Sequence, residues 1–309
     1  MIPLFYSAIP IDRAGHLRRD AQAMTGLLAD PRRIVIPYWR ELSLVAPPKG
    51  LSFTGVQAAM LLDLADEVAF LGLAADGAPV LAADISGVAP EADGAGPGLG
   101  LGGQWLALRT IVPAMDHGDS GLLAYARGLL GWLRRSRFCG SCGGPTEARE
   151  AGHVRACLDP HCGAQQYPRT DPAVIMLVED GERVLLHRQH AWPAGMWSIL
   201  AGFVEPGETL EEAVAREVFE ETAITVADVR YAGSQPWPFP SSLMVGFTAR
   251  ATGIDLVPCP EELEDARWFS RAEIDRDFSD AHRHDGSGPF LANPGTIARQ
   301  MLEAWRRGE

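Results

Sequence analysis

Apolar and polar residues alternate in short runs through the first third of the chain. Such runs span residues 33–37, 67–73 and 105–112, with turn-forming residues between them. Alternation of this kind, rich in β-branched and aromatic residues, predicts short β-strands. Between the last two runs, residues 86–103 contain seven Gly in eighteen positions, which predicts a flexible surface loop.

A long helix is predicted over residues 119–137. Leu and Ala recur there at helical spacing, and Asp119 or Ser120 can cap the start. The last turn is basic, which suits the negative C-terminal end of a helix dipole. Its basic residues are Arg134, Arg135 and Arg137.

From residue 171 onward, strand-like and helix-like patterns alternate. Apolar runs predict strands at 173–178, 183–187, 243–249 and 266–269, and helical spacing predicts helices at 209–222 and 294–306. The whole chain is therefore expected to have an α/β (α+β) fold. Three domains are expected: an N-terminal α/β domain over 1–137, a compact Cys-rich segment over 138–168, and a second α/β domain over 169–309.

The composition limits the number of domains and argues against a membrane protein. The chain has 309 residues, of which 47% are apolar and 22% charged, as in a folded protein of about two domains. No stretch approaches the roughly 20 apolar residues of a membrane helix, and the first residues lack the pattern of a signal peptide. We therefore expect a cytoplasmic protein that does not contact membranes.

The net charge of −13 is unevenly distributed. Residues 1–138 carry 12 Lys and Arg against 13 Asp and Glu, whereas residues 139–309 carry 15 against 27. Such acidity disfavours broad coating of DNA or RNA, which depends on basic side chains. Acidic side chains in the second half are either solvated surface or a cluster that binds divalent cations.

Four of the five cysteines fall within 24 residues. Cys139 and Cys142 form one pair, and Cys157 and Cys162 form the other. Two such knuckles on a short hairpin supply four thiolates for one tetrahedral Zn²⁺ ion. His161 in place of Cys162 and a pair of disulfides are the alternatives, and a reducing cytosol disfavours disulfides. A closed four-ligand site has no open position for water, so this zinc is expected to be structural.

A Glu-rich helix carries the strongest chemical signal. Residues 209–212 form a Thr-x-x-Glu capping box, so a helix begins there. Glu217, Glu220 and Glu221 then share one helix face, and Arg216 is the only basic residue of the helix. Like charges gathered in this way fit Mg²⁺ or Mn²⁺, whereas the plain alternative is a solvated acidic face.

The same segment resembles the Nudix box, Gly-x5-Glu-x7-Arg-Glu-apolar-x-Glu-Glu-x-Gly-apolar. One position departs from the box, because Ala223 replaces its closing Gly. If the backbone there is left-handed, Ala costs about 1 kcal/mol relative to Gly. The matching residues are Gly202, Glu208, Arg216, Glu217, Val218, Glu220, Glu221 and Ile224.

A proline-rich segment narrows the resemblance. Residues 234–242 read Ser-Gln-Pro-Trp-Pro-Phe-Pro-Ser-Ser, which excludes a helix or a central strand. They form either a stiff extended loop or, through Trp237 and Phe239, a rigid aromatic surface for a planar base. This segment resembles the signature of NADH pyrophosphatases, a Nudix subfamily. The resemblance covers about residues 139–309, and residues 1–138 match only loosely.

The resemblance implies a C-terminal Nudix α/β/α sandwich with a mixed sheet, and hydrolysis of NADH or NAD⁺ to nicotinamide mononucleotide and AMP. Roughly two or three Mg²⁺ or Mn²⁺ ions would take part. Their ligands would be the Ala201 carbonyl with Glu217, Glu220, Glu221 and Glu262. Neighbouring acidic residues leave the register of Glu262 open, and either Glu220 or Glu262 would deprotonate water. Arg216 would orient the carboxylates.

The resemblance also implies a substrate site. Phe203 and Tyr167 would sandwich an aromatic base, with core packing as the alternative for both. Other expected lining residues are Gln235, Pro236, Trp237, Pro238, Phe239, Pro240, Ser241, Ser242, Ala298 and, from the N-terminal domain, Arg109.

Other functions remain open from sequence. The same site would also remove NAD caps from RNA 5′ ends, or hydrolyse a broader set of dinucleotides and ADP-ribose-type compounds. RNA would need a local basic patch. A non-catalytic zinc-ribbon scaffold is a further alternative, which the complete carboxylate set disfavours. The resemblance implies a homodimer. The candidate basic residues are Arg32, Arg33, Arg134, Arg135 and Arg137.

Overall fold

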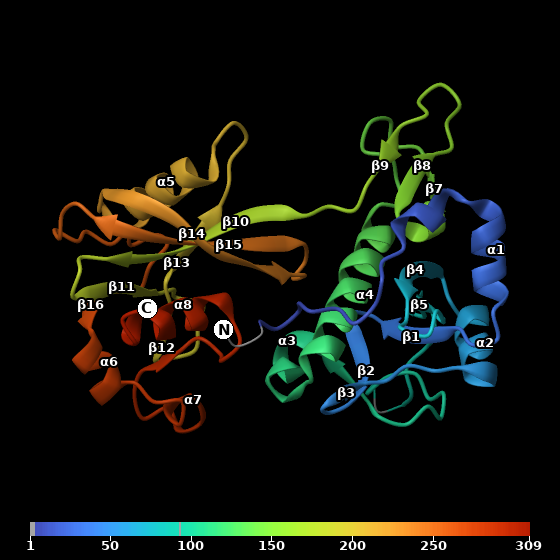
Figure 1. Cartoon of the computed structure of the whole chain (residues 1–309), viewed down its shortest axis with the longest axis horizontal. Coiled ribbons are helices and arrows are strands. Elements are labelled where there is room, and N and C mark those ends of the chain that lie inside the picture. The colour runs from blue at the N-terminus through green and yellow to red at the C-terminus, as the bar shows by residue number, and fades with distance from the viewer. Residues whose placement is uncertain (1–3, 93) are drawn as a thin grey trace. The chain divides into compact units, whose positions relative to one another are not determined.

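The computed structural model describes residues 4–92 and 94–309. Residues 1–3, at the predicted N-terminal domain's start, and Asp93, in the predicted Gly-rich loop, lie outside the described residues. The chain forms two compact units (Figure 1). The N-terminal unit contains Phe5–Thr170 and Trp237–Ser241, and the C-terminal unit contains Leu4, Asp171–Pro236 and Ser242–Glu309.

The N-terminal unit is built on a six-stranded mixed sheet with the order β3-β2-β1-β5-β4, and β6 pairs with β2. Strands β1 and β5 are parallel, whereas β1 with β2 and β2 with β6 are antiparallel. The strands are β1 (Ile34–Trp39), β2 (Leu42–Ala46), β3 (Lys49–Gly50), β4 (Glu67–Leu73), β5 (Pro79–Asp84) and β6 (Gln104–Ala107).

Helices cover both faces of this sheet because side chains along each strand point alternately to its two sides. Ile36 and Tyr38 pack with Leu130 of α4 (His117–Arg135) on one face, whereas Val35 packs with Leu61 of α2 (Gly55–Asp63) on the other. The result is an α/β/α sandwich. Its helices are η1 (Gly15–Arg19), α1 (Ala21–Ala29), α2 (Gly55–Asp63), α3 (Leu108–Ile111), η2 (Val112–Ala114) and α4 (His117–Arg135).

Two local predictions for this unit are wrong in detail. The run 105–112 is a strand only as far as Ala107, and the chain then turns into α3. Helix α4 begins at His117 with Asp116 at its N-cap, so neither Asp119 nor Ser120 caps it. The Ser120 hydroxyl is used elsewhere, because it donates to the His117 carbonyl and accepts from the Tyr6 amide.

The Cys-rich segment forms a small three-stranded antiparallel sheet with the order β7-β8-β9. Gly152, whose φ is +90°, ends the turn between β7 and β8, and an added Cβ there would lie 3.0 Å from Ala69 of β4. The elements are β7 (Thr146–Arg149), η3 (Glu150–Gly152), β8 (Val154–Cys157) and β9 (Gln165–Gln166).

The C-terminal unit has a second mixed sheet with the order β14-β15-β10-β11-β16, and β13 pairs with β10. Here β10 and β15 are parallel over their whole length. The strands are β10 (Asp171–Glu179), β11 (Arg183–Arg188), β13 (Leu200–Phe203), β14 (Val226–Trp237), β15 (Ser242–Ala251) and β16 (Asp265–Ser270); β12 (Met196–Trp197) pairs separately with β17 (Phe290–Leu291).

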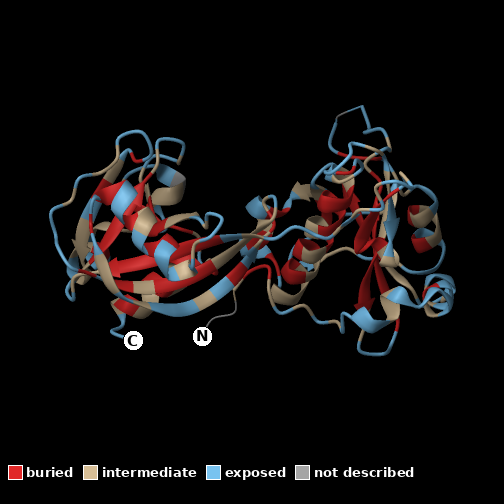
Figure 2. Ribbon diagram, turned by 90° about the horizontal axis from the view of Figure 1, so that it is seen from above, coloured by how far each residue is buried: buried red, intermediate tan, exposed pale blue. Residues whose placement is uncertain are grey.

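Helices again cover both faces of this sheet. Val174 and Met176 of β10 pack with Val218 on one side, and Ile175 packs with Met301 on the other. Figure 2 shows the buried residues following the strands of each unit. The α/β class, the mixed sheets and the sandwich are thus confirmed. The helices are α5 (Leu210–Thr222), α6 (Arg271–Asp277), α7 (His282–Asp285) and α8 (Ile297–Arg306). No helix among the described residues is long and apolar enough to cross a membrane.

Candidate active site and zinc ribbon

The four cysteines of the ribbon converge. Their Sγ atoms all lie within 4.8 Å of one another, and His161 is not part of this group. The distances Cys139–Cys162 and Cys142–Cys157 are 3.8 and 3.5 Å, much longer than the ~2 Å of a disulfide, and all the cysteines are free. The disulfide alternative is therefore wrong, and the donor set is that of a closed tetrahedral zinc site.

Backbone amides stabilise the thiolate form of one ribbon cysteine, Cys139. Amides of the first knuckle, including that of Cys142, lower the pKa of Cys139 to about 6. A thiolate is the form that binds zinc, so this knuckle favours the ligating state. Gly143 and Gly163 have φ of 74° and 60°, the left-handed conformation that lets each knuckle turn tightly.

Helix α5 presents the carboxylates. Its N-cap is Thr209, whose Oγ1 accepts from the Glu212 amide at 3.2 Å while the Glu212 carboxylate accepts from the Thr209 amide at 2.8 Å. This capping box fixes where the helix begins and therefore which of its residues face the sheet. Val214 and Val218 are buried against the sheet, and Glu217 borders that apolar stripe on the side that faces Gly202 of β13.

Arg216 ties the acidic residues together. Its Nε donates to Glu208 Oε1 at 2.5 Å, and its Nη1 donates to Glu217 and to Glu220, both at 2.9 Å. Its Nη2 donates to the Phe203 carbonyl at 2.9 Å. The bond from Arg216, with one from the Glu205 amide, lowers the pKa of Glu208 to about 2. Arg216 thus joins the loop before the helix to the helix itself.

Gly202 shows why the box begins with glycine. A Cβ at this position would lie 1.9 Å from Cδ of Glu217, so any side chain would displace the Glu217 carboxylate. Gly202 follows Ala201 in β13, which pairs with β10. The sheet therefore places the Ala201–Gly202 backbone directly against the acidic face of α5.

Glu221 lies in the least solvated position of the group. It is 3% exposed, and its Oε2 has no hydrogen-bond partner. Burial, with the nearby charges of Glu217 and Glu262, raises the pKa of Glu221 to about 8. Burial also raises the pKa of Glu217, and Glu262 again contributes. A buried carboxylate beside two others fits a divalent cation, whose charge offsets both burial and repulsion.

The structure also distinguishes among the late acidic residues. Glu264 pairs with Arg188 at 2.7 Å, and Glu261 accepts from the Cys259 thiol at 3.3 Å. Glu262 is the one whose charge acts on Glu217 and Glu221. The Cys259 amide donates to the Glu221 carbonyl at 2.8 Å, which ties this loop to the end of α5.

The aromatic residues of the Pro-rich segment pack on the N-terminal unit. The Trp237 and Phe239 rings lie 5.5 Å apart, edge to face, and Tyr6 contacts them at 5.5 and 5.3 Å. Arg109 lies 5.7 Å from the Trp237 ring centre. Both rings are half-buried, so part of their surface is used in core packing.

The remaining candidates are distributed as follows. Phe203 and Tyr167 are each 59% exposed, so the core-packing alternative is wrong for both. Ala298 is buried in α8. Gln235 is buried, and its side chain accepts from the Ile297 amide at 2.9 Å and donates to the Gly295 carbonyl at 3.1 Å. Gln235 is therefore occupied in holding β14 to the start of α8.

Comparison with known proteins agrees with this geometry. Residues 169–291 match the NUDIX domain, 134–167 the NADH pyrophosphatase zinc ribbon domain, and 33–132 an NADH pyrophosphatase-like rudimentary NUDIX domain. The chain is 38% identical to the NAD-capped RNA hydrolase NudC of Mycobacterium bovis over 98% of this chain and 95% of that protein.

The chain belongs to the NADH pyrophosphatase group of Nudix hydrolases. It is also 42% identical to the NAD-capped RNA hydrolase NudC of Stutzerimonas stutzeri over 66% of this chain and 68% of that protein. Nudix hydrolase 19, chloroplastic, of Arabidopsis thaliana is 50% identical over 56% of this chain, but the match spans 43% of that protein's length. This Nudix hydrolase is an enzyme, a pyrophosphohydrolase.

In this Nudix hydrolase, Ala223 has the left-handed conformation of the glycine it replaces. Its φ is 59°, and its amide donates to the Phe219 carbonyl to close α5. The helix end thus keeps its geometry, at the conformational cost that the sequence predicted.

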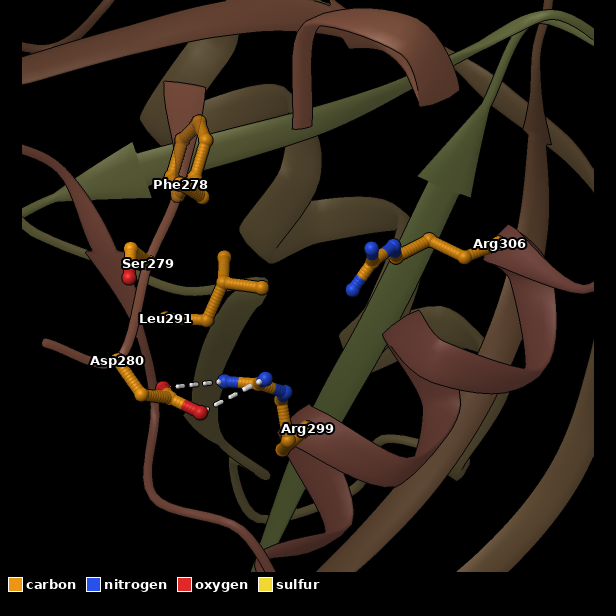
Figure 3. Close-up of a pocket in the computed structure, with 6 residues that line it drawn as sticks. All are labelled: Phe278, Ser279, Asp280, Leu291, Arg299 and Arg306. Carbon is orange, nitrogen blue, oxygen red and sulfur yellow. Dashed lines mark hydrogen bonds and ion pairs between the residues drawn. The ribbon is translucent and has the colours of Figure 1, made fainter. Parts of the chain in front are cut away.

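A small cavity in the C-terminal unit is separate from the acidic group (Figure 3). Its volume is about 20 Å³, enough for one water molecule. Arg299 pairs there with Asp280 and Glu303, and Arg306 pairs with Glu303 and Asp275. Its arginines are neutralised within the protein, and none of the predicted site residues lines it.

Proposed function

We propose that this Nudix hydrolase cleaves the pyrophosphate bond of NADH or NAD⁺, giving nicotinamide mononucleotide and AMP. The observation that carries the proposal is the buried Glu221 carboxylate, whose Oε2 has no hydrogen-bond partner, beside Glu217 and Glu262. Such a group is stable with bound divalent cations, here Mg²⁺ or Mn²⁺. The group of known proteins with matching ribbon and N-terminal domains supports the choice of substrate.

The residues would divide the work. Glu217, Glu221, Glu262 and the Ala201 carbonyl would hold roughly two or three cations, which offset phosphate charge and make water more acidic. Glu220 or Glu262 would accept a proton from the attacking water. The new P–O bond would form in line with the P–O bond that breaks. The second phosphate would then leave as a phosphomonoester, so that both products are monoesters.

Glu220 is the better placed of the two candidate bases. Its side chain is 58% exposed and is held by an ion pair with Arg216 at 2.9 Å. The charge of Glu262 acts on both Glu217 and Glu221, whereas that of Glu220 acts on Glu217. A base needs contact with water and a fixed direction, and Glu220 has both.

The test is AMP release from NADH with Mn²⁺, for the wild type, Glu220→Gln and Glu211→Gln. Loss of a general base lowers kcat by about 10²–10⁴-fold, so Glu220→Gln is expected to fall in that range. Glu211→Gln makes the same change on the exposed first turn of α5 and is expected to match the wild type. Full activity of Glu220→Gln would show that another residue is the base, and an inactive wild type would overturn the proposed function.

Removal of NAD caps from RNA 5′ ends is the second candidate, because relatives along the whole chain bear that name. Turnover of NAD-capped RNA and free NADH at matched salt separates the two. Basic side chains at the end of α4 offer contacts for RNA phosphates. The same proposal includes a homodimer, testable by light scattering after size exclusion, and a cytoplasmic location, which suits four reduced cysteines.

A further inference from the structure

The segment Trp237–Ser241 packs with the N-terminal unit, although the strands on both sides of it belong to the other unit. Arg127 of α4 makes the polar contact that holds it. Arg127 Nε donates to the Pro238 carbonyl at 2.9 Å, and its guanidinium carbon lies 4.9 Å from the Phe239 ring centre. One side chain therefore fixes both the backbone and an aromatic ring of the segment.

The other nitrogens of Arg127 bind Glu41. Nη1 donates to the Glu41 carbonyl at 2.6 Å, and Nη2 donates to Glu41 Oε2 at 3.0 Å. The Arg127 side chain is only 11% exposed. A planar guanidinium bound on two sides has one orientation, and little of it is open to a ligand. Arg127 is thus built to hold the segment and not to contact substrate.

Apolar contacts complete the support. Tyr6 is 2% exposed and meets both aromatic rings of the segment edge to face. Gly128, next to Arg127, lies where an added Cβ would be 3.8 Å from Pro238. The segment therefore rests on one turn of α4, with Arg127 as the polar member of the contact.

We infer that Arg127 is a positioning residue for the reaction, because it holds Trp237–Ser241 in the shape that recognises the dinucleotide. The inference rests on the proposed function, which assigns this segment to the substrate site. Among the described residues, Arg127 hydrogen-bonds to Glu41 and Pro238 and to none of the carboxylates of α5. Its loss should therefore weaken binding of the dinucleotide more than it slows the chemical step.

The first measurement is steady-state kinetics with NADH and Mn²⁺. Arg127→Met keeps the length of the stem and removes the donors. We expect KM to rise about 10–100-fold, the effect of losing a hydrogen bond to a charged group, with kcat changed less than about threefold. Arg127→Lys keeps the charge but offers no planar fork, so a smaller rise in KM is expected; this variant also serves if Arg127→Met does not fold.

Arg13→Met is the matched control. Arg13 stacks over Tyr125 of the same helix, with its guanidinium carbon 4.0 Å from the ring centre. The substitution removes an arginine–aromatic contact of α4 without touching the segment. We expect KM and kcat of the wild type. An equal rise in KM for Arg13→Met and Arg127→Met would mean that α4 is merely disturbed, and would overturn the inference.

The second measurement is hydrogen exchange, which needs no activity. In Arg127→Met the amides of Trp237, Phe239 and Ser241 should exchange faster, whereas α5 should be unchanged. Unchanged exchange at these amides, or an unchanged KM in an active enzyme, overturns the inference. A wild type that releases no AMP overturns the proposed function instead, and the exchange result then still decides whether Arg127 holds the segment.

Discussion

The two units share one strand arrangement but differ in the helix that precedes the outer strand β4 or β14. The path β4-β5-β1-β2-β6 in the N-terminal unit corresponds to β14-β15-β10-β11-β16 in the C-terminal unit. In each sheet the two central strands are parallel, β1 with β5 and β10 with β15. The match of residues 33–132 to a rudimentary NUDIX domain agrees with this correspondence.

The difference between the units is the helix that comes before β4 in one unit and before β14 in the other. Helix α5 precedes β14 and carries Glu217, Glu220, Glu221 and Arg216, whereas α2 precedes β4 and reads Gly-Val-Gln-Ala-Ala-Met-Leu-Leu-Asp. Both helices pack an apolar stripe on their sheet, through Leu61 in α2. The shared sheet therefore explains folding, and the polar face of one helix explains the chemistry.

The largest expected effect is on kcat, and it distinguishes a substitution in α5 from one in α2. Glu217→Ala removes a carboxylate that would bind cation, and a bound cation supplies several kcal/mol of transition-state stabilisation. We therefore expect kcat for AMP release to fall about 10³-fold or more. Gln57→Ala, on the exposed face of α2, should leave kcat unchanged. Comparable losses in both variants would break the distinction between the units.

The sequence predicted the part of the site that depends on neighbouring residues, which is helix α5. The capping box and apolar stripe of 209–222 define α5 to within a residue, and the Glu spacing then follows from helix geometry. Strand β14 gave no clear pattern because it is an edge strand in which half of the residues are exposed and one is buried. The packing of Trp237–Ser241 on Tyr6 joins residues more than 200 positions apart, and no local pattern encodes such a contact.

Long-range contacts also bear on the choice of single residues. The sequence favoured Glu262 but left its register open, and in the structure its neighbour Glu264 is ion-paired with Arg188. Arg127 gave no signal at all in the sequence, since an arginine in a helix is ordinarily solvated. Its partner Glu41 lies 86 residues away.

A second expected effect compares one ion pair in each unit. Glu67 of β4 pairs with Arg155, and their side chains are 14% and 4% exposed. Glu67→Gln leaves a buried arginine charge, and we expect the free energy of unfolding to fall by about 3–5 kcal/mol. Glu264 is 43% exposed in its pair with Arg188, so Glu264→Gln should cost at most about 1 kcal/mol. Urea unfolding measures both, and equal costs would contradict this assignment.

The third effect concerns pH and is expected in both units. Burial lowers the pKa of His153 in the N-terminal unit and of His187 in the C-terminal unit to about 4. Near pH 7 both are neutral, folded or unfolded. Below about 6.5 the unfolded chain binds protons that the folded chain does not, so stability falls until about pH 4, by roughly 3 kcal/mol for each histidine.

Unfolding in urea between pH 7.5 and 4.5, for the wild type and His187→Gln, measures this effect. The variant should be less stable at pH 7.5 but lose less on acidification than the wild type. A pH dependence of the same size in both proteins would mean that His187 titrates normally in the folded state.

The smallest effect compares the ends of the two helices. Helix α5 ends at left-handed Ala223, whereas α2 ends at Leu64 with φ of −88°. Ala223→Gly should raise the free energy of unfolding by about 1 kcal/mol, because glycine adopts the left-handed conformation without strain. Leu64→Gly should not stabilise the protein. Denaturant midpoints test both, and no gain from Ala223→Gly would show that the helix end relaxes around alanine.

The placement of Trp237–Ser241 bears on how this protein could be divided or recombined. The chain passes between units after Leu4, Thr170, Pro236 and Ser241. A single cut therefore releases neither unit whole, and a gene fragment starting near residue 171 would express a five-residue insert without Tyr6 or Arg127 to receive it. The two sheets have the same strand order, yet neither unit is a single continuous stretch of the chain, so a functional fragment has to include both.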